Sequence, residues 1–279
     1  MTTLPMPRLS IVIVTYNSTG HIDGCLRSLV EDPPSLDREI VVVDNASVDG
    51  TANGVRTRWN GVRVIDAGAN LGFARANNLG IQQTFGELIL LLNPDTLVNP
   101  GALDSLVATL HAHPDVAIVG PRLVNGDGRA ELSFGRMLSP VAELRQKILV
   151  RGSQRGGAIA AYVESITRRE RDVDWVSGAC LLVRRADAVA VGLMDERYFM
   201  YAEDVDFCAA VRARGRRVLF SPAAEVIHLR GQSRATTAFA ATERAYRRSK
   251  MAFYEKHHPA WAPWLRWYLK LTGGLPDNQ

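Results

Sequence analysis

The sequence predicts an α/β protein built on a mostly parallel, helix-covered sheet. Short apolar runs rich in Val, Ile and Leu alternate with longer helical stretches through the N-terminal half, and this alternation is typical of such sheets. The chain has 279 residues, of which 47% are hydrophobic and 22% are charged. That composition is typical of an ordinary globular protein, with room for one large domain or two small ones.

Four apolar runs in the N-terminal half are expected to be buried strands, because they are short, apolar and bounded by turn residues. They cover residues 9–15, 39–44, 62–65 and 87–92. Ser18 or Thr19 is expected to cap the first helix. The expected helices end near residue 30, follow the turn-rich residues 45–50, and cover about 70–84 and 100–113.

The second half of the chain mixes strands with less regular segments. Strands are expected at residues 116–119, 173–183, 217–220 and 224–227, with a hairpin turn at 125–128. Ser177 and Gly178 interrupt the second of these strands. Residues 138–171 show a loose pattern, in which the glycine-rich residues 151–157 are expected to form a mobile loop. Such a loop is either a lid beside a site or an idle insertion.

Polar residues stand at the ends of three predicted strands: Thr15-Tyr16-Asn17, Asp44-Asn45 and Asn93-Pro94-Asp95. In a parallel sheet, ligands bind outside the carboxyl ends of the strands, so these residues predict a binding edge. Neither a Gly-x-Gly-x-x-Gly nor a Gly-x-x-x-x-Gly-Lys motif follows the first strand. The sequence therefore argues against a dinucleotide-dependent oxidoreductase and a P-loop phosphotransferase.

Carboxylates at these strand ends suit two tasks. Asp44 can accept hydrogen bonds from a nucleobase or a ribose. Asp95 follows a proline that holds the turn in shape, and its carboxylate suits a hard divalent cation bound together with diphosphate oxygens. Asn93 adds no charge, so a further ligand is needed, and His228 is the candidate. The alternative for His228 is an ordinary, hydrogen-bonded imidazole.

An acidic and aromatic stretch, residues 198–207, combines Glu203, Asp204 and Asp206 with Met200 and several aromatic rings. Only residues three or four apart become neighbours on a helix, so Asp204 and Asp206 are expected on different faces. Asp204 is the candidate general base, whose pKa the aromatic residues would raise by excluding water. Asp206 is expected to be structural. The plainer interpretation is an acidic first turn of a helix that ends near residue 214.

Further candidate contacts come from two segments of the second half. Gly178 lets a ligand approach the backbone beside Ser177, and Trp175 suits stacking on a sugar face, although a core position is the default for a Trp. Arg230 and Ser233 are well suited to contact a diphosphate.

The two ends of the chain differ in charge. Residues 1–140 carry 10 basic and 14 acidic side chains, whereas residues 205–279 carry 13 basic and 5 acidic ones. The basic C-terminal part predicts an anionic partner. Residues 242–254 are expected to form a basic helix, and residues 261–270 combine four aromatic rings with Arg and Lys. This aromatic segment is expected either to lie on a membrane surface or to dock on the core or on a partner subunit.

The cysteines and the apolar runs predict a cytoplasmic location. Cys25, Cys180 and Cys208 are far apart, form no metal or redox spacing and fit a reducing compartment. The apolar run at residues 9–14 is too short for the core of a signal peptide. No apolar run approaches the ~20 residues that span a bilayer.

These motifs together resemble the inverting family-2 glycosyltransferases of the GT-A fold, in their rhamnosyltransferase branch. The matching motifs are SIVIVTYN at 10–17, VVDNASVDGT at 42–51, NLGFA at 70–74, NPD at 93–95, WVSGA at 175–179 and FMYAEDVD at 199–206. Each is weak alone, but their shared order is specific. The resemblance implies a GT-A domain over 1–235, with a nucleotide-sugar half at about 8–120 and an acceptor half at about 121–235 that carries a smaller sheet. A helical, basic and aromatic extension follows over 236–279.

The resemblance also implies roles for individual residues of the donor side. Thr15, Tyr16 and Asn17 would line the nucleotide pocket, and Asp44 would bind the base. Asn70, Arg75 and Asn93 are further expected nucleotide contacts. Arg75 stands where the family often has a small residue, so it would either contact phosphate or block part of the pocket.

On the reaction side, the resemblance implies that Asp204 is the general base and Glu203 its neighbour. Asp95 and His228 would hold Mg²⁺ or Mn²⁺ on the donor diphosphate, although Asn93-Pro94-Asp95 replaces the common Asp-x-Asp. Trp175, Ser177, Gly178, Arg230 and Ser233 are expected to contact the acceptor or phosphate.

The implied reaction transfers a sugar, with L-rhamnose from dTDP-rhamnose as the family-level expectation, to a hydroxyl of a cell-envelope glycan or a polyprenyl-linked acceptor. The expected location is the cytoplasm, with association to the inner face of the membrane; a homodimer is left open. The alternatives are a UDP- or GDP-sugar donor and a non-catalytic nucleotide-sugar binder. A nucleotidyltransferase would need a Gly-rich basic loop after the first strand, and a processive synthase would need a Gln-x-x-Arg-Trp motif; neither is present. No nucleic-acid partner is expected.

Overall fold

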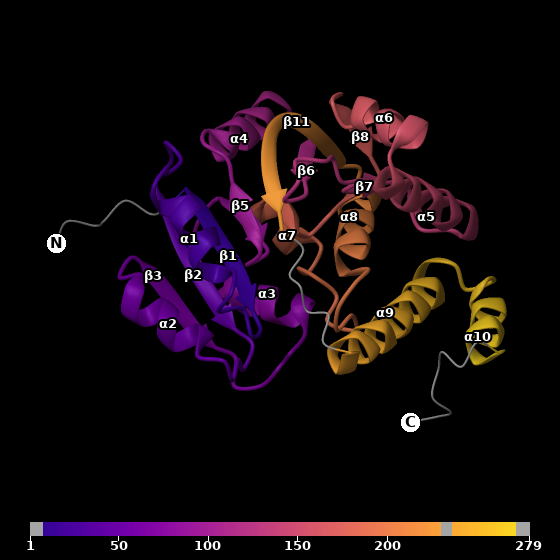
Figure 1. The fold of residues 1–279 in the computed structure, drawn as a ribbon, viewed down its shortest axis with the longest axis horizontal. Coiled ribbons are helices and arrows are strands. Elements are labelled where there is room, and N and C mark those ends of the chain that lie inside the picture. The colour runs from indigo at the N-terminus through magenta and orange to yellow at the C-terminus, as the bar shows by residue number, and fades with distance from the viewer. Residues whose placement is uncertain (1–7, 230–235, 272–279) are drawn as a thin grey trace.

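The computed structural model describes residues 8–229 and 236–271, with the side chains of 236–242 left aside. Its main sheet has strand order β3-β2-β1-β4-β10-β6-β11-β5, with β8 beside β11, and β7 and β9 form a small second sheet (Figure 1). These strands are β1 Leu9–Thr15, β2 Arg38–Asp44, β3 Val62–Asp66, β4 Leu88–Leu92, β5 Thr96–Val98, β6 Val116–Val124, β7 Phe134–Gly135, β8 Arg171–Val173, β9 Trp175–Val176, β10 Cys180–Arg184 and β11 Arg217–His228.

Helices alternate with the strands of the N-terminal half and then dominate the C-terminal part. The helices are α1 Ile22–Val30, α2 Thr51–Arg58, α3 Phe73–Gln82, α4 Ala102–Ala112, α5 Pro140–Arg155, α6 Gly157–Ile166, α7 Arg185–Ala190, α8 Glu203–Ala213, α9 Thr236–His257 and α10 Ala262–Leu271. Strands β1 to β4 pair in parallel with one another, and β10 runs antiparallel between β4 and β6. The predicted mostly parallel, helix-covered sheet is confirmed.

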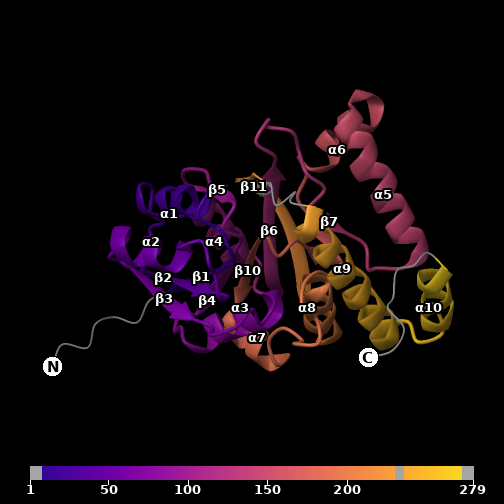
Figure 2. The ribbon, with the colours of Figure 1, turned by 60° about the horizontal axis from the view of Figure 1, so that its bottom comes forward.

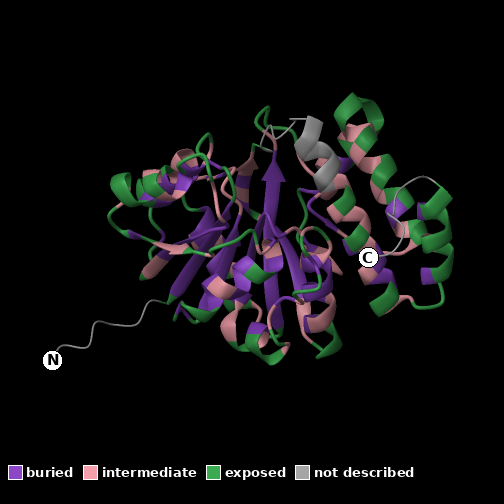
Figure 3. Ribbon diagram, turned by 90° about the horizontal axis from the view of Figure 1, so that it is seen from below, coloured by how far each residue is buried: buried purple, intermediate pink, exposed green. Residues whose placement is uncertain are grey.

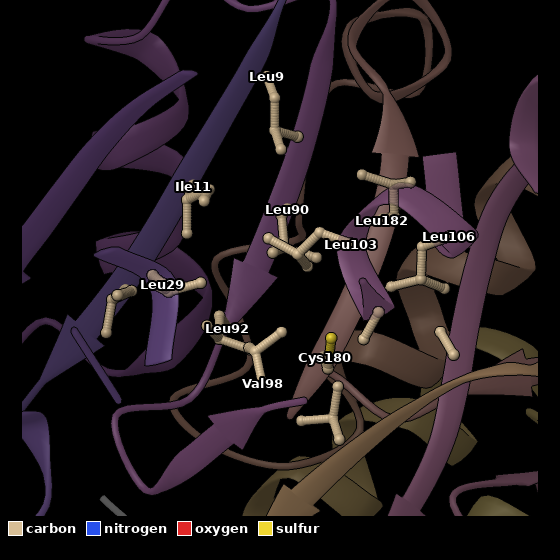
Figure 4. Packing of buried hydrophobic residues seen from close by; sticks show 14 of the residues in the cluster. Leu9, Ile11, Leu29, Leu90, Leu92, Val98, Leu103, Leu106, Cys180 and Leu182 are labelled. Atoms are coloured by element: carbon tan, nitrogen blue, oxygen red, sulfur yellow. The ribbon is translucent and has the colours of Figure 1, made fainter. Parts of the chain in front are cut away.

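The core consists of two apolar layers, one on each face of the sheet. Along β1, Leu9, Ile11 and Ile13 belong to one buried cluster, and Val12 and Val14 belong to the other, because successive side chains of a strand point to opposite faces. Helices α1, α2 and α4 contribute to the first cluster and α3, α7 and α8 to the second. Figure 4 shows the first cluster from close by, and Figure 3 shows the buried strands of the sheet between helices that are partly exposed.

Two expectations about single elements of the fold are wrong. Helix α1 begins at Ile22 with His21 in the capping position, and neither Ser18 nor Thr19 caps it, since Thr19 instead bonds Asp49. The expected strands at 217–220 and 224–227 form the single strand β11, which has an irregular register between Ser221 and Glu225. Pro222 lies in this irregularity, where a missing backbone N–H costs the sheet least.

The loose segment at residues 138–171 is largely helical. Helix α5 starts with Ser139, whose side chain accepts a hydrogen bond from the backbone N–H of Ala142, and Pro140 stands at its first position. Both features favour a helix start. The expected mobile loop at residues 151–157 is therefore wrong, because most of it belongs to α5. Only Gly156, with φ of 82°, breaks the helix before α6.

Candidate active site

The carboxyl ends of β1 and β2 are joined by buried polar contacts. The Thr15 hydroxyl donates to Asp44 Oδ1 over 3.0 Å, and the Ser47 backbone N–H donates to Asp44 Oδ2 over 2.9 Å. Both Thr15 and Asp44 are buried. Asp44 therefore holds the two strand ends together. Its contact with a nucleobase stays a prediction, for which the carboxylate still has lone pairs that can accept a hydrogen bond.

The loop after β1 is fixed against the loop after β2. The Asn17 backbone N–H donates to Ser47 Oγ, and the Val48 backbone N–H donates to Asn17 Oδ1, both over 2.9 Å. Asn17 has a left-handed backbone with φ of 51°, a conformation that Asn tolerates better than most residues. Tyr16 is exposed beside this loop, so its ring is accessible to a nucleotide.

A third loop, residues 70–73, connects this edge to the acidic stretch. Asn45 Nδ2 donates to Asn70 Oδ1 over 3.0 Å, and the backbone N–H of Phe73 donates to the carbonyl of Phe199 over 2.6 Å. Gly72 lies between them with φ of 81°, and a Cβ there would stand 2.3 Å from the Phe199 carbonyl oxygen. The NLGFA motif thus needs its glycine for close contact with the segment ahead of Glu203. Nearby, Arg75 pairs with Glu196 at 3.6 Å.

The candidate metal ligands meet at the end of β4. His228, the last residue of β11, places Nε2 3.5 Å from Asp95 Oδ1, and its Nδ1 lies 3.2 Å from Glu131 Oε2. Burial opposes the charged form of His228, but the hydrogen bonds and charges of the two carboxylates outweigh it and raise its pKa to about 9. The predicted pair Asp95 and His228 is therefore brought together, with Glu131 as a partner that the sequence did not indicate.

This pair fits a divalent cation in donor type and in spacing. Ligand bonds of about 2.1 Å at a right angle place two donor atoms about 3 Å apart, close to the observed 3.5 Å between His228 and Asp95. A carboxylate on the second ring nitrogen is the common arrangement for a metal-binding His, and Glu131 supplies it. Within residues 8–229 and 236–271, no group of three or more His, Cys, Asp or Glu is arranged to hold a metal.

The candidate base, Asp204, lies in the first turn of α8, and its carboxylate contacts the turn at residues 177–179. Gly178 donates its backbone N–H to Asp204 Oδ2 over 2.9 Å, and Val205 donates to Oδ1 over 2.8 Å. A Cβ on Gly178 would stand 3.3 Å from both Asp204 Cβ and the Phe73 ring. Burial raises the pKa of the half-buried Asp204 above its ordinary value, although these backbone donors oppose the shift.

Glu203 differs from Asp204 in its surroundings. It is buried, and its Oε2 has no hydrogen-bond partner. Burial, and then the charge of Asp204, raise the pKa of Glu203 well above its ordinary value. Adjacent acids in unequal environments can take different roles in catalysis. Burial without a hydrogen-bond partner for Oε2 favours the neutral form of Glu203, whereas two backbone donors favour the charged form of Asp204.

Asp206 is structural, as expected from its place on another face of the helix. It accepts hydrogen bonds from the Tyr198 hydroxyl over 3.1 Å, from Lys256 over 2.8 Å and from His257 over 2.6 Å. Of the aromatic rings expected to shield Asp204, Tyr198 is instead buried against Asp206, and Phe199 and Tyr201 are exposed. The expected direction of the shift is nevertheless confirmed, because burial raises the pKa of Asp204. The plainer interpretation of the stretch, an acidic first turn, is confirmed.

The same turn at Ser177, Gly178 and Ala179 connects the base to the metal motif. While Gly178 binds Asp204, the carbonyl of Ala179 accepts the backbone N–H of Asn93 over 2.9 Å. Trp175, just before the turn, packs against Gly135 and donates its indole N–H to the carbonyl of Arg136. Its contact with an acceptor stays a prediction. Arg230 and Ser233 lie outside the described residues.

Comparison with known proteins assigns the family. The glycosyl transferase family 2 model matches residues 10–172, which is more than half of the chain. The chain belongs to glycosyl transferase family 2. It is 34% identical over 280 residues to the N-acetylglucosaminyl-diphospho-decaprenol L-rhamnosyltransferase of Mycobacterium tuberculosis, covering 94% of this chain and 89% of that protein.

Two further comparisons agree with this assignment. The rhamnosyltransferase WbbL of Escherichia coli is 45% identical over 225 residues, covering 78% of this chain and 82% of WbbL. The mannosyltransferase PcManGT of Pyrobaculum calidifontis, solved with GDP-Man and Mn²⁺, superposes with a TM-score of 0.61 at 18% identity. It covers 94% of this chain and 68% of PcManGT. The predicted GT-A fold and glycosyltransferase activity of this chain are therefore confirmed.

The site combines residues that the sequence pointed to with others that it did not. Asn45 joins the ends of β1 and β2 to the loop that carries Asn70, in contact with Thr15 and Asp44. The 177–179 turn joins Asn93 to Asp204, and Asp95, two residues after Asn93, faces His228. Asn45 belongs to one of the three polar strand ends that predict the binding edge. Glu131 carries no local signal, since it lies 97 residues before His228.

Proposed function

We propose that this family 2 glycosyltransferase moves L-rhamnose from dTDP-rhamnose to a hydroxyl of a lipid-linked glycan acceptor of the cell envelope, with inversion at the sugar. The names of two relatives support the sugar: both are rhamnosyltransferases, and one acts on a diphospho-decaprenol acceptor by its name. The observation that supports this proposal most is the 177–179 turn, in which Gly178 binds Asp204 while Ala179 binds Asn93. It fixes the candidate base at a set distance from the donor-side motif.

Asp204 acts as the general base in this proposal. The acceptor oxygen forms a bond to the anomeric carbon, the bond from that carbon to the diphosphate oxygen breaks, and the acceptor proton passes to the Asp204 carboxylate. Two backbone donors hold this carboxylate ready, and its raised pKa makes it a better proton acceptor than an exposed Asp. Burial raises the pKa of the neighbouring Glu203 well above its ordinary value, which favours the uncharged form of Glu203 beside the base.

Asp95 and His228 would hold a Mg²⁺ or Mn²⁺ ion. The ion would supply charge neutralisation to the leaving diphosphate. Glu131 orients the His228 ring through Nδ1, so that Nε2 faces Asp95. The Mn²⁺ in PcManGT, a protein of the same fold, supports a metal-dependent donor site. With only two protein ligands, most of the coordination would come from the donor and water.

We also propose that the reaction takes place at the cytoplasmic face of the membrane. All three cysteines are free and buried, which fits a reducing compartment. None of the helices in the described part of the chain is long and apolar enough to cross a bilayer. A lipid-linked acceptor would therefore be reached from the membrane surface.

A panel of nucleotide sugars tests the donor. Thermal stabilisation is measured with dTDP-rhamnose, UDP-N-acetylglucosamine and GDP-mannose, each with and without Mn²⁺. The expected result is a metal-dependent shift that is largest for dTDP-rhamnose. A larger shift with a UDP- or GDP-sugar would replace the donor, and equal shifts with and without metal would overturn the role of Asp95 and His228.

Asp204→Asn tests the base in the same experiment. The variant should keep the thermal shift with donor and lose 10²- to 10⁴-fold in turnover, the usual contribution of general base catalysis. Normal turnover by the variant would show that Asp204 is not the base.

A further inference from the structure

Helix α10 presents its most apolar side to solvent. Trp264, Trp267 and Leu271 are 68%, 60% and 67% exposed, and their spacing of three and four residues places them on one side of the helix. Ala262 and Leu269, on the opposite side, are buried. Trp261 and Tyr268 extend the exposed stripe. A soluble helix normally shows the reverse arrangement, so this side needs a partner.

Helix α5 continues this surface. Its Val141, Leu144 and Ile148 are exposed and spaced by three and four residues. Leu144 lines one groove together with Trp264 and Tyr268 of α10, and one end of α5 lies close to α10 in both ribbon views (Figures 1 and 2). We call this combined area the α5–α10 surface, defined by the exposed residues Val141, Leu144, Ile148, Trp261, Trp264, Trp267, Tyr268 and Leu271.

The inner sides of the two helices of the α5–α10 surface are packed against the rest of the protein. Glu143, buried on the inner side of α5, accepts hydrogen bonds from Lys250 and from the Tyr254 hydroxyl of α9. His258 bonds the carbonyl of Leu138 over 2.7 Å. The buried residues of α10 join an apolar cluster with Tyr254 and Phe253. Helix α9 therefore holds the inner sides of both helices, and their exposed sides meet at the groove lined by Leu144, Trp264 and Tyr268.

The two helices that carry the apolar stripe are both net basic, and Arg266 of α10 also pairs with Glu255 of α9. Helix α5 carries four basic residues and one acidic residue, and that acidic residue is the buried Glu143; α10 carries two basic residues and no acidic one. Aromatic rings flanked by Lys and Arg are the composition of a membrane-water interface, whereas the cores of protein interfaces are depleted of Lys. The charge therefore favours an anionic lipid surface over a second copy of the chain.

We propose that the α5–α10 surface binds the face of an anionic lipid bilayer, with the Trp264, Trp267 and Leu271 side chains inserted between headgroups. The helix lies on the membrane and does not cross it, since α10 has only 10 residues and a span needs about 20. This surface is independent of the donor and of the base, so the proposal does not rest on the proposed transfer reaction.

Flotation with lipid vesicles tests the proposal on the full chain. The chain should bind vesicles that contain phosphatidylglycerol, bind vesicles of phosphatidylcholine alone more weakly, and lose the difference at about 1 M salt, where the Debye length falls to about 3 Å. Tryptophan emission should shift to the blue on binding and be quenched by brominated lipid. Absence of binding and of any emission change with anionic vesicles would overturn the proposal.

Matched variants locate the surface. Combining Trp264→Ser, Trp267→Ser and Leu271→Ser should weaken vesicle binding at least tenfold with an unchanged circular dichroism spectrum. The control combines Phe85→Ser and Val189→Ser, whose side chains are 60% and 59% exposed outside this surface, and should bind as the parent does. Lys147→Gln and Lys270→Gln should each weaken only the binding to anionic vesicles, by roughly fivefold.

Light scattering separates the membrane from a second copy. The proposal expects the triple variant and the parent to have the same mass in solution. A parent dimer that the triple variant converts to a monomer, without vesicle binding by the parent, would assign the surface to a homodimer and refute the proposal. Transfer to a water-soluble acceptor analogue should be equal in the parent and the triple variant, so a failure of vesicle binding leaves the proposed reaction unaffected.

Discussion

Asp204 and Asp206 stand two residues apart on one helix, and we expect their replacement by Asn to have opposite consequences. Asp204 accepts two backbone N–H groups at the mouth of the site. Asp206 is 2% exposed and accepts hydrogen bonds from the Tyr198 hydroxyl, from Lys256 and from His257. Asp204→Asn should therefore lose activity and keep stability, whereas Asp206→Asn should lose stability.

The magnitude for Asp206 follows from its partners. Removing one member of a buried ion pair costs about 3–5 kcal/mol, because the remaining charge loses its compensation. Lys256 also pairs with Asp195 over 2.8 Å, so it is not left without an anion, and the Asn oxygen still accepts one hydrogen bond. The lower end, about 3 kcal/mol, is therefore expected. For a chain of this size that corresponds to a melting temperature roughly 6–12 °C lower.

For Asp204→Asn, the large expected effect is on the turnover rate and not on stability. An Asn oxygen keeps one of the two backbone donors, so the loss of stability should be about 1 kcal/mol or less. Turnover should fall 10²- to 10⁴-fold because the amide cannot take the acceptor proton. Urea unfolding and steady-state turnover are measured for both variants. Equal loss of stability in the two variants, or full turnover by Asp204→Asn, would refute this division of roles.

Three further predictions address other parts of the site. Glu131→Gln should weaken Mn²⁺ binding 10- to 100-fold in calorimetry, because it removes the carboxylate that orients His228, whereas Glu87→Gln, in an exposed ion pair with Arg8, should change nothing; equal affinities would contradict the role of Glu131. Gly72→Ala should destabilise the chain by about 2–4 kcal/mol, since it adds a clash with Phe199 to a positive φ. The control Gly128→Ala, at φ of 76° with no atom within 4 Å, should cost only about 1–2 kcal/mol in the same urea unfolding. Finally, Asp204 must be ionised to act, and its pKa lies above the ordinary value of 3.8. The pH profile of kcat/KM should therefore fall with decreasing pH through an apparent pKa above that value, and a fall only at or below 3.8 would refute the base assignment.

The fold was predictable where local pattern and burial agree. Strand β1 is buried along its whole length, so its apolar run identifies it without further information. Helix α5 shows the opposite case. Its Val141, Leu144 and Ile148 face solvent while Glu143 is buried, so the apolar stripe does not point to the core and the sequence offers no ordinary amphipathic signal. A helix whose apolar side serves as a surface is therefore easily taken for a loop.

In the candidate site, too, residues with a local sequence signal were predictable and residues without one were not. Residues at strand ends and in short motifs, such as Asp95 and Asp204, were predictable because their chemistry is local to the motif. The contacts that hold them are not local: Glu131 reaches His228 across 97 residues, and Lys256 reaches Asp206 across 50. Such partners depend on how β11 and α9 pack, and no spacing rule in the sequence encodes that packing.

The C-terminal helices α9 and α10 link the surroundings of the candidate base to the proposed membrane surface. Predicted as an extension beyond residue 235, they share one buried cluster with Tyr198 and Val205, which stand on either side of Glu203 and Asp204 in the sequence. The last turn of α9 holds Asp206 through Lys256 and His257, two residues from the proposed base. The same helix binds Glu143 of α5 and leads into α10. The segment that carries the proposed membrane surface is therefore also the segment that fixes the start of α8, so docking on a bilayer would hold the base in a set position relative to the lipid surface.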